Sequence, residues 1–342
     1  MSYDATRMAF CLMVAATFAA DFPQTGSCAE AGAAATAASP SRFANTVHEF
    51  ADVVSGAELV RQCPKVVFIK KDMDPRPYGH ATLPTFDSQK FGVQICIYDP
   101  ATPKTPPSVI FSREDGQIYD MNLNYEATRL LFAYRDRDYS KNYLIYEINI
   151  DGTGLRQLTS GPFIDVSPQY LSDGRIVFIS SRSKAYGLCQ PHEMTGIFTM
   201  NPDGSDIVRI GYGSLAETSP AILDDGRVLY TRWEYVDKDV CLQQGLWTVH
   251  PDGRQVALYY GNTITVPPVM WQARQIPGTQ KVLATLCAHH GYPVGPLGII
   301  DNRKGLEEPA SLTCITPDEP LTPSKHPFSY PEVVPRCDTQ RV

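Results

Sequence analysis

The sequence predicts an all-β protein, a β-propeller of four-stranded blades, from two observations: an internal repeat of about 50 residues and the Asp-Gly pairs within it. Pairs stand at Asp151-Gly152, Asp203-Gly204 and Asp252-Gly253, 52 and 49 residues apart. A second register, Asp173-Gly174 and Asp225-Gly226, is again spaced by 52 residues. Because glycine accepts the positive φ of a tight turn, Asp-Gly between two apolar, β-branched runs predicts a hairpin.

The two registers together give each repeat two hairpins, or four strands. A single unit of this size cannot cover both of its faces, so neighbouring copies must stack, and radial stacking of four-stranded units makes a propeller. About five blade-sized segments can be read, at 60–110, 111–160, 161–212, 213–262 and 263–316. Five is a low number of blades, so we expect a further segment or a partner to complete the ring. The main rival architecture is a β-solenoid.

The N-terminal region reads as a leader. Arg7 precedes an apolar stretch, Met8 to Ala20, that has the length of a signal-peptide core and is too short for a transmembrane helix. An Ala-rich spacer follows. We therefore expect a signal peptide and low-complexity spacer over 1–40, a linker over 41–59 and the propeller over 60–342. This organisation predicts a periplasmic or extracellular protein without a membrane span; the alternative is a disordered cytosolic tail.

Charge and cysteine content exclude several classes. The net charge is −7, and no run of Lys and Arg forms the basic patch that nucleic-acid binding needs. Nine cysteines are scattered without any C-x-x-C pair, which excludes zinc-ribbon and thioredoxin spacings and the C-x-x-C-H attachment site of c-type haem. Some cysteines are expected to pair in an oxidising compartment; Cys189 and Cys241, in equivalent insertions of neighbouring repeats, are one candidate pair, and the sequence does not fix the pairing.

Several strings resemble known propellers. The segment 155–159 (LRQLT) resembles the WD40-like repeats of TolB-type propellers, while 225–237 (DGRVLYTRWEYVD), 246–253 (LWTVHPDG) and 273–278 (ARQIPG) resemble the propeller domain of the hydrazine synthase alpha subunit family. The resemblance covers roughly residues 64–330 and implies a propeller in a periplasmic setting. The family's catalytic subunit carries several haems, whereas this chain has no C-x-x-C-H motif, so we expect no covalent haem. No cofactor is predicted, and a bound metal stays open.

Four histidines are candidate metal ligands. His289 and His290 follow an expected strand at 281–286, His80 lies in a loop, and His192 stands three residues after Cys189 in a long insertion. Adjacent residues of a strand point to opposite faces, so His289 and His290 share a metal only if the strand has ended. The structural alternative is one buried, hydrogen-bonded histidine and one surface histidine. Cys189 and His192 alone give two of the four usual zinc ligands.

A second candidate site is the aromatic segment Trp233, Glu234 and Tyr235. An aromatic surface with a carboxylate suits a ligand such as a sugar, whereas the structural reading places the two rings between blades.

The sequence contains no G-x-S-x-G nucleophile motif and no phosphate-binding loop. We therefore expect a secreted binding or scaffold propeller that meets a protein partner or a small ligand at its face, with no enzyme activity of its own. Two alternatives stay open. One is a metal-dependent, lyase-like enzyme using converging histidines, and the other is a redox subunit whose haem is supplied by another chain.

Overall fold

A computed structural model describes residues 65–71, 91–102, 104–137, 142–187, 193–234, 243–264, 266–287, 289 and 295–316. The chain divides into two compact units. One comprises Met1–Ile69 and Ile95–Val109, and the other comprises Lys70–Gln94 and Ile110–Val342. The strands β1 (Val66–Lys71), β2 (Val93–Tyr98) and β3 (Ser108–Arg113) form a three-stranded sheet, called blade 1 below.

The second unit contains four antiparallel arrays of four strands each, which are blades 2 to 5. Each falls within one of the expected segments from 111 to 316, and the all-β propeller prediction is confirmed. Their strands are β4 (Gly116–Leu123), β5 (Arg129–Asp136), β6 (Leu144–Asn149) and β7 (Arg156–Gln157); β8 (Asp165–Tyr170), β9 (Ile176–Tyr186), β10 (Glu193–Met200) and β11 (Val208–Arg209); β12 (Ala216–Ile222), β13 (Val228–Trp233), β14 (Gln244–Val249) and β15 (Ala257–Tyr260); and β16 (Val269–Gln275), β17 (Val282–Cys287), β18 (Leu297–Ile300) and β19 (Leu312–Cys314).

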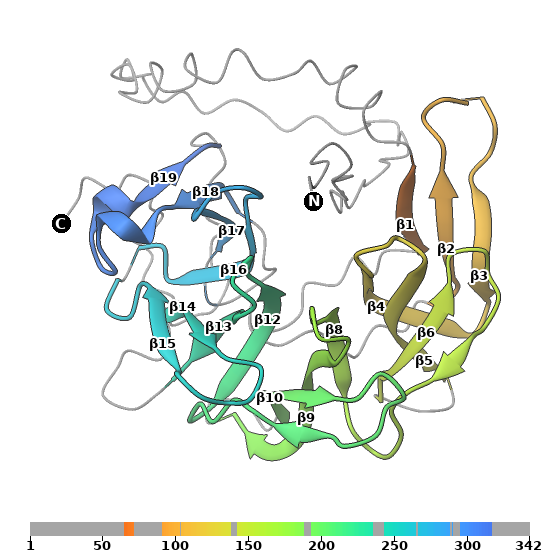
Figure 1. The fold of residues 1–342 in the computed structure, drawn as a ribbon, viewed down its shortest axis with the longest axis horizontal. Coiled ribbons are helices and arrows are strands. Elements are labelled where there is room, and N and C mark those ends of the chain that lie inside the picture. The colour runs from red at the N-terminus through yellow and green to blue at the C-terminus, as the bar shows by residue number, and fades with distance from the viewer. Residues whose placement is uncertain are drawn as a thin grey trace, which may run out of the picture. The chain divides into compact units, whose positions relative to one another are not determined.

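The first strand of each blade lies nearest the axis of this unit. β4 contacts β8, β8 contacts β12 and β12 contacts β16, as expected of the innermost strands of a propeller. In Figure 1 the four sheets follow one another around a curve, with these four strands toward its inside. Blades 4 and 5 are also joined by a parallel pairing of Gln244 in β14 with Val269 in β16.

All five Asp-Gly pairs form hairpin turns of one geometry. The glycine has φ between +84° and +88°, and its N–H donates to the carbonyl three residues earlier at 2.8–3.0 Å. The loop has three residues, a type I turn closed by glycine in the left-handed region. The aspartate side chain accepts the N–H of the residue after glycine at 2.9–3.0 Å. Sequence and local geometry therefore agree at every repeat.

A β-bulge interrupts the first strand of each of blades 2 to 5. The pairing with the second strand shifts between Ile118 and Met121, Val166 and Gln169, Thr218 and Ala221, and Trp271 and Arg274. Ser167, Ser219 and Gln272 adopt φ of +52° to +55° there. The repeated Ser-Pro dipeptides of the sequence mark two of these bulges, which turn side chains toward the axis.

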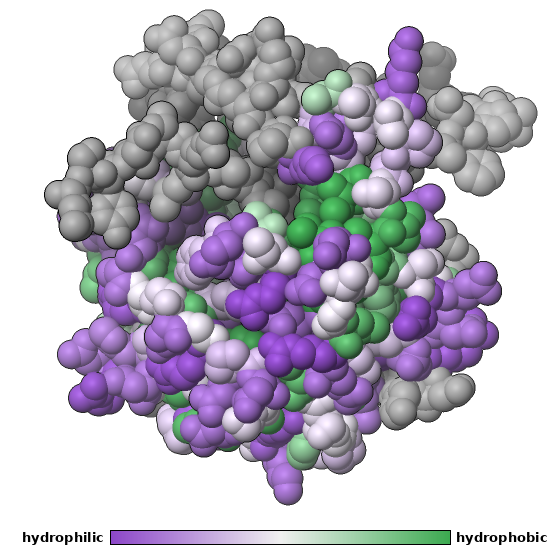
Figure 2. Space-filling view, turned by 45° about the vertical axis from the view of Figure 1, so that its right-hand side comes forward, coloured by the Kyte–Doolittle hydropathy of each residue, from purple (hydrophilic) through white to green (hydrophobic). Residues whose placement is uncertain are grey.

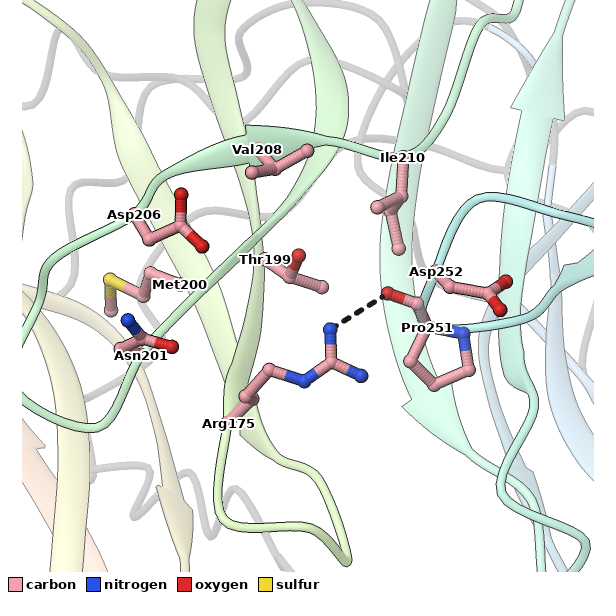
Figure 3. A pocket seen from close by; sticks show the side chains of 9 residues that line it. All are labelled: Arg175, Thr199, Met200, Asn201, Asp206, Val208, Ile210, Pro251 and Asp252. Atoms are coloured by element: carbon pink, nitrogen blue, oxygen red, sulfur yellow. Dashed lines mark hydrogen bonds between the residues drawn. The ribbon is translucent and has the colours of Figure 1, made fainter.

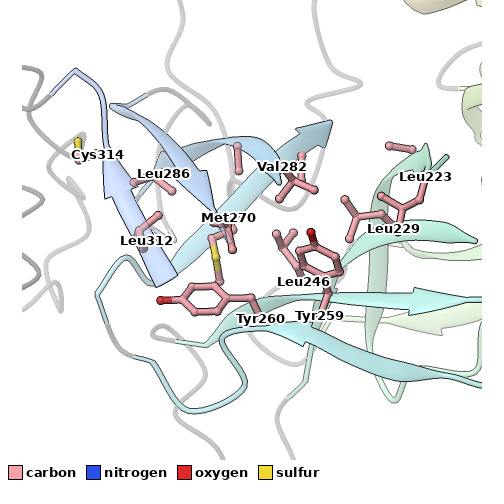
Figure 4. Close-up of a cluster of buried hydrophobic side chains, with 14 residues drawn as sticks. Leu223, Leu229, Leu246, Tyr259, Tyr260, Met270, Val282, Leu286, Leu312 and Cys314 are labelled. Carbon is pink, nitrogen blue, oxygen red and sulfur yellow. The ribbon is translucent and has the colours of Figure 1, made fainter. Parts of the chain in front are cut away.

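The core lies between neighbouring blades rather than inside one sheet. Figure 4 shows the cluster between blades 4 and 5, where side chains from β13, β14 and β15 meet those of β16, β17 and β19. Figure 2 shows one face of the molecule. The described residues on this face are mostly hydrophilic, and an apolar area lies in the upper half of the picture. In the described part of the chain, no helix has the length and apolar character needed to cross a bilayer.

Candidate functional site

We call three charged residues of the second unit, Lys71, Asp120 and Arg274, the central charge cluster. Lys71 ends β1, Asp120 lies in the bulge of β4, and Arg274 follows the bulge of β16. The charges of Lys71 and Arg274 both act on the carboxyl group of Asp120. All three belong to the second unit. The bulges position the cluster, because they direct side chains of the innermost strands out of the regular pleat.

Asp120 is held by the neighbouring blade. Its Oδ1 accepts the N–H of Ser167, in the bulge of β8, at 3.0 Å. Burial raises the pKa of Asp120 to about 6, while the hydrogen bonds from Ser167 and the charges of Arg274 and Lys71 act in the opposite direction. The carboxylate is therefore ionised at neutral pH but gains a proton in mildly acidic solution.

The two cations are each anchored to backbone carbonyls. Lys71 Nζ donates to Ile118 O at 3.1 Å, and Arg274 Nη1 donates to Pro220 O at 3.1 Å and to Ala273 O at 3.2 Å. Burial lowers the pKa of both side chains, and the Asp120 carboxylate raises it. Arg274 nevertheless remains exposed to solvent. Among the described residues, no ion pair within 4.0 Å joins Asp120 to either cation.

Two other acidic residues of the innermost strands accept hydrogen bonds from the protein. Asp165 of β8 accepts Ser180 Oγ at 2.6 Å and pairs with Arg182, and Glu217 of β12 accepts Gly213 N at 2.9 Å. Each lies one residue before the residue at which the bulge of its strand begins, which is Val166 in β8 and Thr218 in β12. Both carboxylates are buried. Glu217 also accepts the N–H of Ile197 in blade 3 at 3.3 Å and so links two blades, as Asp120 does through Ser167.

His289 and Trp233, predicted separately from the sequence, lie together. Their rings are 4.9 Å apart in an edge-on arrangement, and His289 Nδ1 is hydrogen-bonded to Gln244 Nε2. Both side chains are buried, His289 at 3% and Trp233 at 1% exposure. Trp233 also packs with Met194 of blade 3, so the structure shows the packing between blades that was the alternative to a ligand platform. Glu234 pairs with Arg232.

The remaining predicted site residues are His80, His192, His290 and Tyr235, and they lie outside the described residues, as do Cys189 and Cys241. Within the described ranges, no group of three or more His, Cys, Asp or Glu side chains is arranged to hold a metal ion. The metal and ligand roles assigned from the sequence therefore stay predictions.

A small pocket of about 90 Å³ lies between blades 3 and 4, away from the cluster (Figure 3). Arg175 reaches across it and donates from Nη1 to Pro251 O at 3.3 Å, while Asp206 and Asp252 stand at its edges. Because the arginine is already bonded to Asp173 and to Pro251, this pocket is a gap in the packing between blades.

The central charge cluster was missed in the sequence. Its signal was present, however. In blades 3 and 4, Pro168 and Pro220 occupy the bulge position that Asp120 occupies in blade 2. Gln169 and Ala221, which are both buried, occupy the position that Arg274 occupies in blade 5. A charged residue at a repeat position that is otherwise proline or buried marks a departure from the structural pattern.

No protein-family model matches this sequence, and no curated protein matches it. Among solved structures, the hydrazine synthase of Kuenenia stuttgartiensis is similar, with a TM-score of 0.58 and 15% identity over 75% of this chain and 40% of that chain. TolB from Acinetobacter baumannii has a TM-score of 0.48 and 13% identity over 75% of this chain and 70% of that chain. An oligogalacturonate lyase in complex with manganese has a TM-score of 0.47 and 12% identity over 62% of this chain and 57% of that chain. The chain thus spans well under half of the hydrazine synthase chain and has a β-propeller fold like it, so the resemblance predicted from the sequence is confirmed at the level of the fold.

Proposed function

We propose that this chain is a periplasmic or extracellular binding propeller that holds its ligand at the central charge cluster. The observation that carries the proposal is that the charges of Lys71 and Arg274 both act on the Asp120 carboxylate, while among the described residues no direct ion pair joins that carboxylate to either cation. A carboxylate that is partly removed from water, as Asp120 is, is normally compensated by a partner. A bound ligand supplies that compensation.

The periplasmic part of the proposal rests on the leader expected over residues 1–40. Expression with the native N-terminus in a Gram-negative host, followed by fractionation and N-terminal sequencing, tests it. We expect a chain that begins between Ala20 and Ala35 in the periplasmic fraction. An intact Met1 on the recovered protein contradicts a cleaved signal.

The binding role is tested by a ligand screen that uses thermal unfolding of the mature chain, because a ligand that binds only the native state raises the unfolding temperature. The screen compares the wild type with Arg274→Gln and, as the matched control, Arg254→Gln. Arg254 lies on an exposed turn and loses the same charge. Compounds that stabilise the wild type and the control but not Arg274→Gln support the proposal; stabilisation of all three proteins by every hit refutes it.

The alternative of a metal-dependent enzyme needs at least three of four histidines to converge, namely His80, His192, His289 and His290, and no contact among the described residues favours it. Elemental analysis of the mature protein separates the two functions. We expect substoichiometric manganese and zinc, whereas one equivalent of bound metal that disappears in His289→Gln would make the metal-dependent function the better account.

A further inference from the structure

We propose that the outward face of blade 5 binds the C-terminal segment of this same chain, residues 326–342, as the first strand of a further blade. The outward face is the side of the sheet from β16 to β19 that points away from blade 4. Residues 326–342 lie outside the described residues. The inference concerns an interaction surface and does not depend on the proposed binding function.

The register of the strands separates the two faces of blade 5. Val282 and Ala284 of β17 belong to the buried cluster that packs against blade 4. Adjacent residues of a strand point to opposite faces, so Leu283 and Thr285 point away from blade 4. The outward face is mostly apolar, and its members follow from the pairing of β17, β18 and β19: Leu283, Thr285, Leu297, Ile299, Thr313 and Ile315.

In blade 4 the corresponding face is covered by blade 5. Its pairs Leu229–Thr248 and Thr231–Leu246 occupy the register positions of the outward pairs of blade 5. These four side chains are 0–1% exposed, and Leu229 and Leu246 belong to the cluster shown in Figure 4. The outward pairs of blade 5 are only half-buried. The outward face is therefore built like a blade interface but is less completely covered.

The chemistry of this face defines what fits it. Leu297 and Ile299 of β18 are half-buried, and Ile315, next to β19, is 36% exposed. Apolar side chains that lie side by side on one sheet favour a partner that removes them from water. Two sheets that share an apolar interface pack about 10 Å apart. The partner that fits is therefore another strand or sheet with apolar side chains.

The C-terminal segment has the sequence of the start of a repeat. Residues 329–334 (SYPEVV) resemble 166–171 (VSPQYL), which include the bulge and the end of the first strand of blade 3. Residues 339–342 (TQRV) resemble 279–282 (TQKV), whose valine begins the second strand of blade 5. The two strings follow one another in the order of a first strand and the start of a second strand. The segment thus supplies the strand that would cover the outward face.

The path of the chain allows the segment to reach this face. β19 is the last described strand, and it ends at Cys314 as the outermost strand of blade 5. Elsewhere the chain passes from an outermost strand to the first strand of the next blade in six to eight residues, at 158–164, 210–215 and 261–268. The connection 315–325 has eleven residues. It is therefore long enough for the same crossing.

Amide hydrogen exchange of the full mature chain, read by mass spectrometry, tests the inference. Amides that are hydrogen-bonded in a packed strand exchange slowly. We expect peptides within 326–342 to exchange at least about tenfold more slowly than the same peptides in the unfolded chain. Exchange of this segment at the unfolded rate in the wild type overturns the inference without any substitution.

The outward face is tested with Leu297→Asp. Its matched control is Leu155→Asp, the same change at an exposed residue of blade 2. A carboxylate facing an apolar strand is costly, so Leu297→Asp should remove the protection of residues 326–342, and the control should keep it. Thr313→Asp, a smaller change on the same face, replaces Leu297→Asp if that variant does not unfold cooperatively. Retained protection in the face variant contradicts the inference.

The segment is tested from its own side with Val333→Asp and Val334→Asp. Because adjacent residues of a strand point to opposite faces, one of the two valines faces blade 5. That variant should raise the exchange rate of amides in β18 and β19, whereas Gln340→Glu, placed between the two expected strands, should not. If neither valine variant changes exchange in β18 and β19, the inference is wrong.

Sedimentation of the full mature chain distinguishes the segment from a second copy of the protein. We expect an oligomeric state that is the same in the wild type and in Leu297→Asp, because the face is covered within one chain. A dimer that dissociates in Leu297→Asp but persists in Leu155→Asp would assign the outward face to a second copy and overturn the inference.

Discussion

Aspartate residues of this chain differ in acidity because their surroundings differ. At the hairpin turns, hydrogen bonds to the side chain lower the pKa of Asp151, Asp203 and Asp252, in the last case to about 2. Burial raises the pKa of Asp120 to about 6 despite two nearby cations. The aspartate anions at the turns thus stabilise the fold, whereas the anion of Asp120 destabilises it.

Substitutions that remove these charges should therefore act in opposite directions. The folded-state pKa of Asp120 lies above the unfolded value near 3.8, so its ionisation destabilises the fold as the pH rises from about 4 to 6. Asp120→Asn keeps an oxygen that accepts from Ser167 and should stabilise the fold at pH 7.5 by about 1 kcal/mol, since partial exposure reduces the full effect. Denaturant unfolding at pH 7.5 measures it.

The matched control is Asp252→Asn, at a turn. Its folded-state pKa lies below the unfolded value, so its anion stabilises the fold above about pH 4, and this stability is lost as the pH falls toward 2. The variant should be less stable than the wild type at pH 7.5. If the two substitutions change the free energy of unfolding in the same direction at this pH, burial does not destabilise the charged form of Asp120.

His289 acts as a packing residue in the described structure. Its ring lies edge-on to Trp233 and bonds to Gln244, whose Oε1 is buried without another partner. His289→Ala leaves a cavity beside the indole and a further unsatisfied amide, so we expect a loss of about 2–4 kcal/mol in unfolding free energy. A change in tryptophan fluorescence should accompany it. His250→Ala, beside a hairpin turn, is the control and should cost little.

At the scale of elements, the glycine of the turn between the third and fourth strands of a blade also fits against the previous blade. A Cβ on Gly152 would lie 3.2 Å from Ile110 O at the end of blade 1, and one on Gly253 would lie 3.5 Å from Ile210 of blade 3. Gly204 approaches Leu158 of blade 2 still more closely. The repeat spacing of the sequence therefore encodes contacts between blades as well as turns.

Alanine substitutions can separate these two roles of glycine. Gly204→Ala meets both a left-handed φ of +87° and the carbonyl of Leu158, whereas Gly226→Ala meets a φ of +84° with no atom within 4 Å. Backbone strain alone should cost about 1–2 kcal/mol in both variants. Gly204→Ala should lose more, because blades 2 and 3 must move apart. Chemical denaturation of the two variants measures the difference, and equal losses would refute the contact.

The sequence predicted the turns and blades because both depend on local residue spacing. It did not predict the bulge geometry, since Ser-Pro within a strand gives no sign of a left-handed serine such as Ser167. It also missed the central charge cluster, because Lys71, Asp120 and Arg274 lie far apart in the sequence and no local residue spacing connects them. The contact between His289 and Trp233 was not predicted from the sequence either, although each residue had been singled out.

At the scale of the whole molecule, the likeness to hydrazine synthase concerns architecture. The shared part is 40% of that chain at 15% identity, which is enough to establish a fold and carries no activity. The second unit of this chain has four arrays of four strands, and Asp120 occupies a bulge position that two other arrays fill with proline.

The isolated chain should therefore have no redox activity of its own. Electron transfer to small molecules needs a cofactor, and covalent haem needs two cysteines in the C-x-x-C-H pattern, which none of the nine cysteines provides. Non-covalent haem through His289 would have to displace its bond to Gln244 and its contact with Trp233. Expressed in the periplasm together with a haem-maturation system, the purified protein should lack a stoichiometric Soret band. A Soret band that persists through gel filtration and disappears in His289→Ala would instead make this chain a haem protein and place its function in redox chemistry.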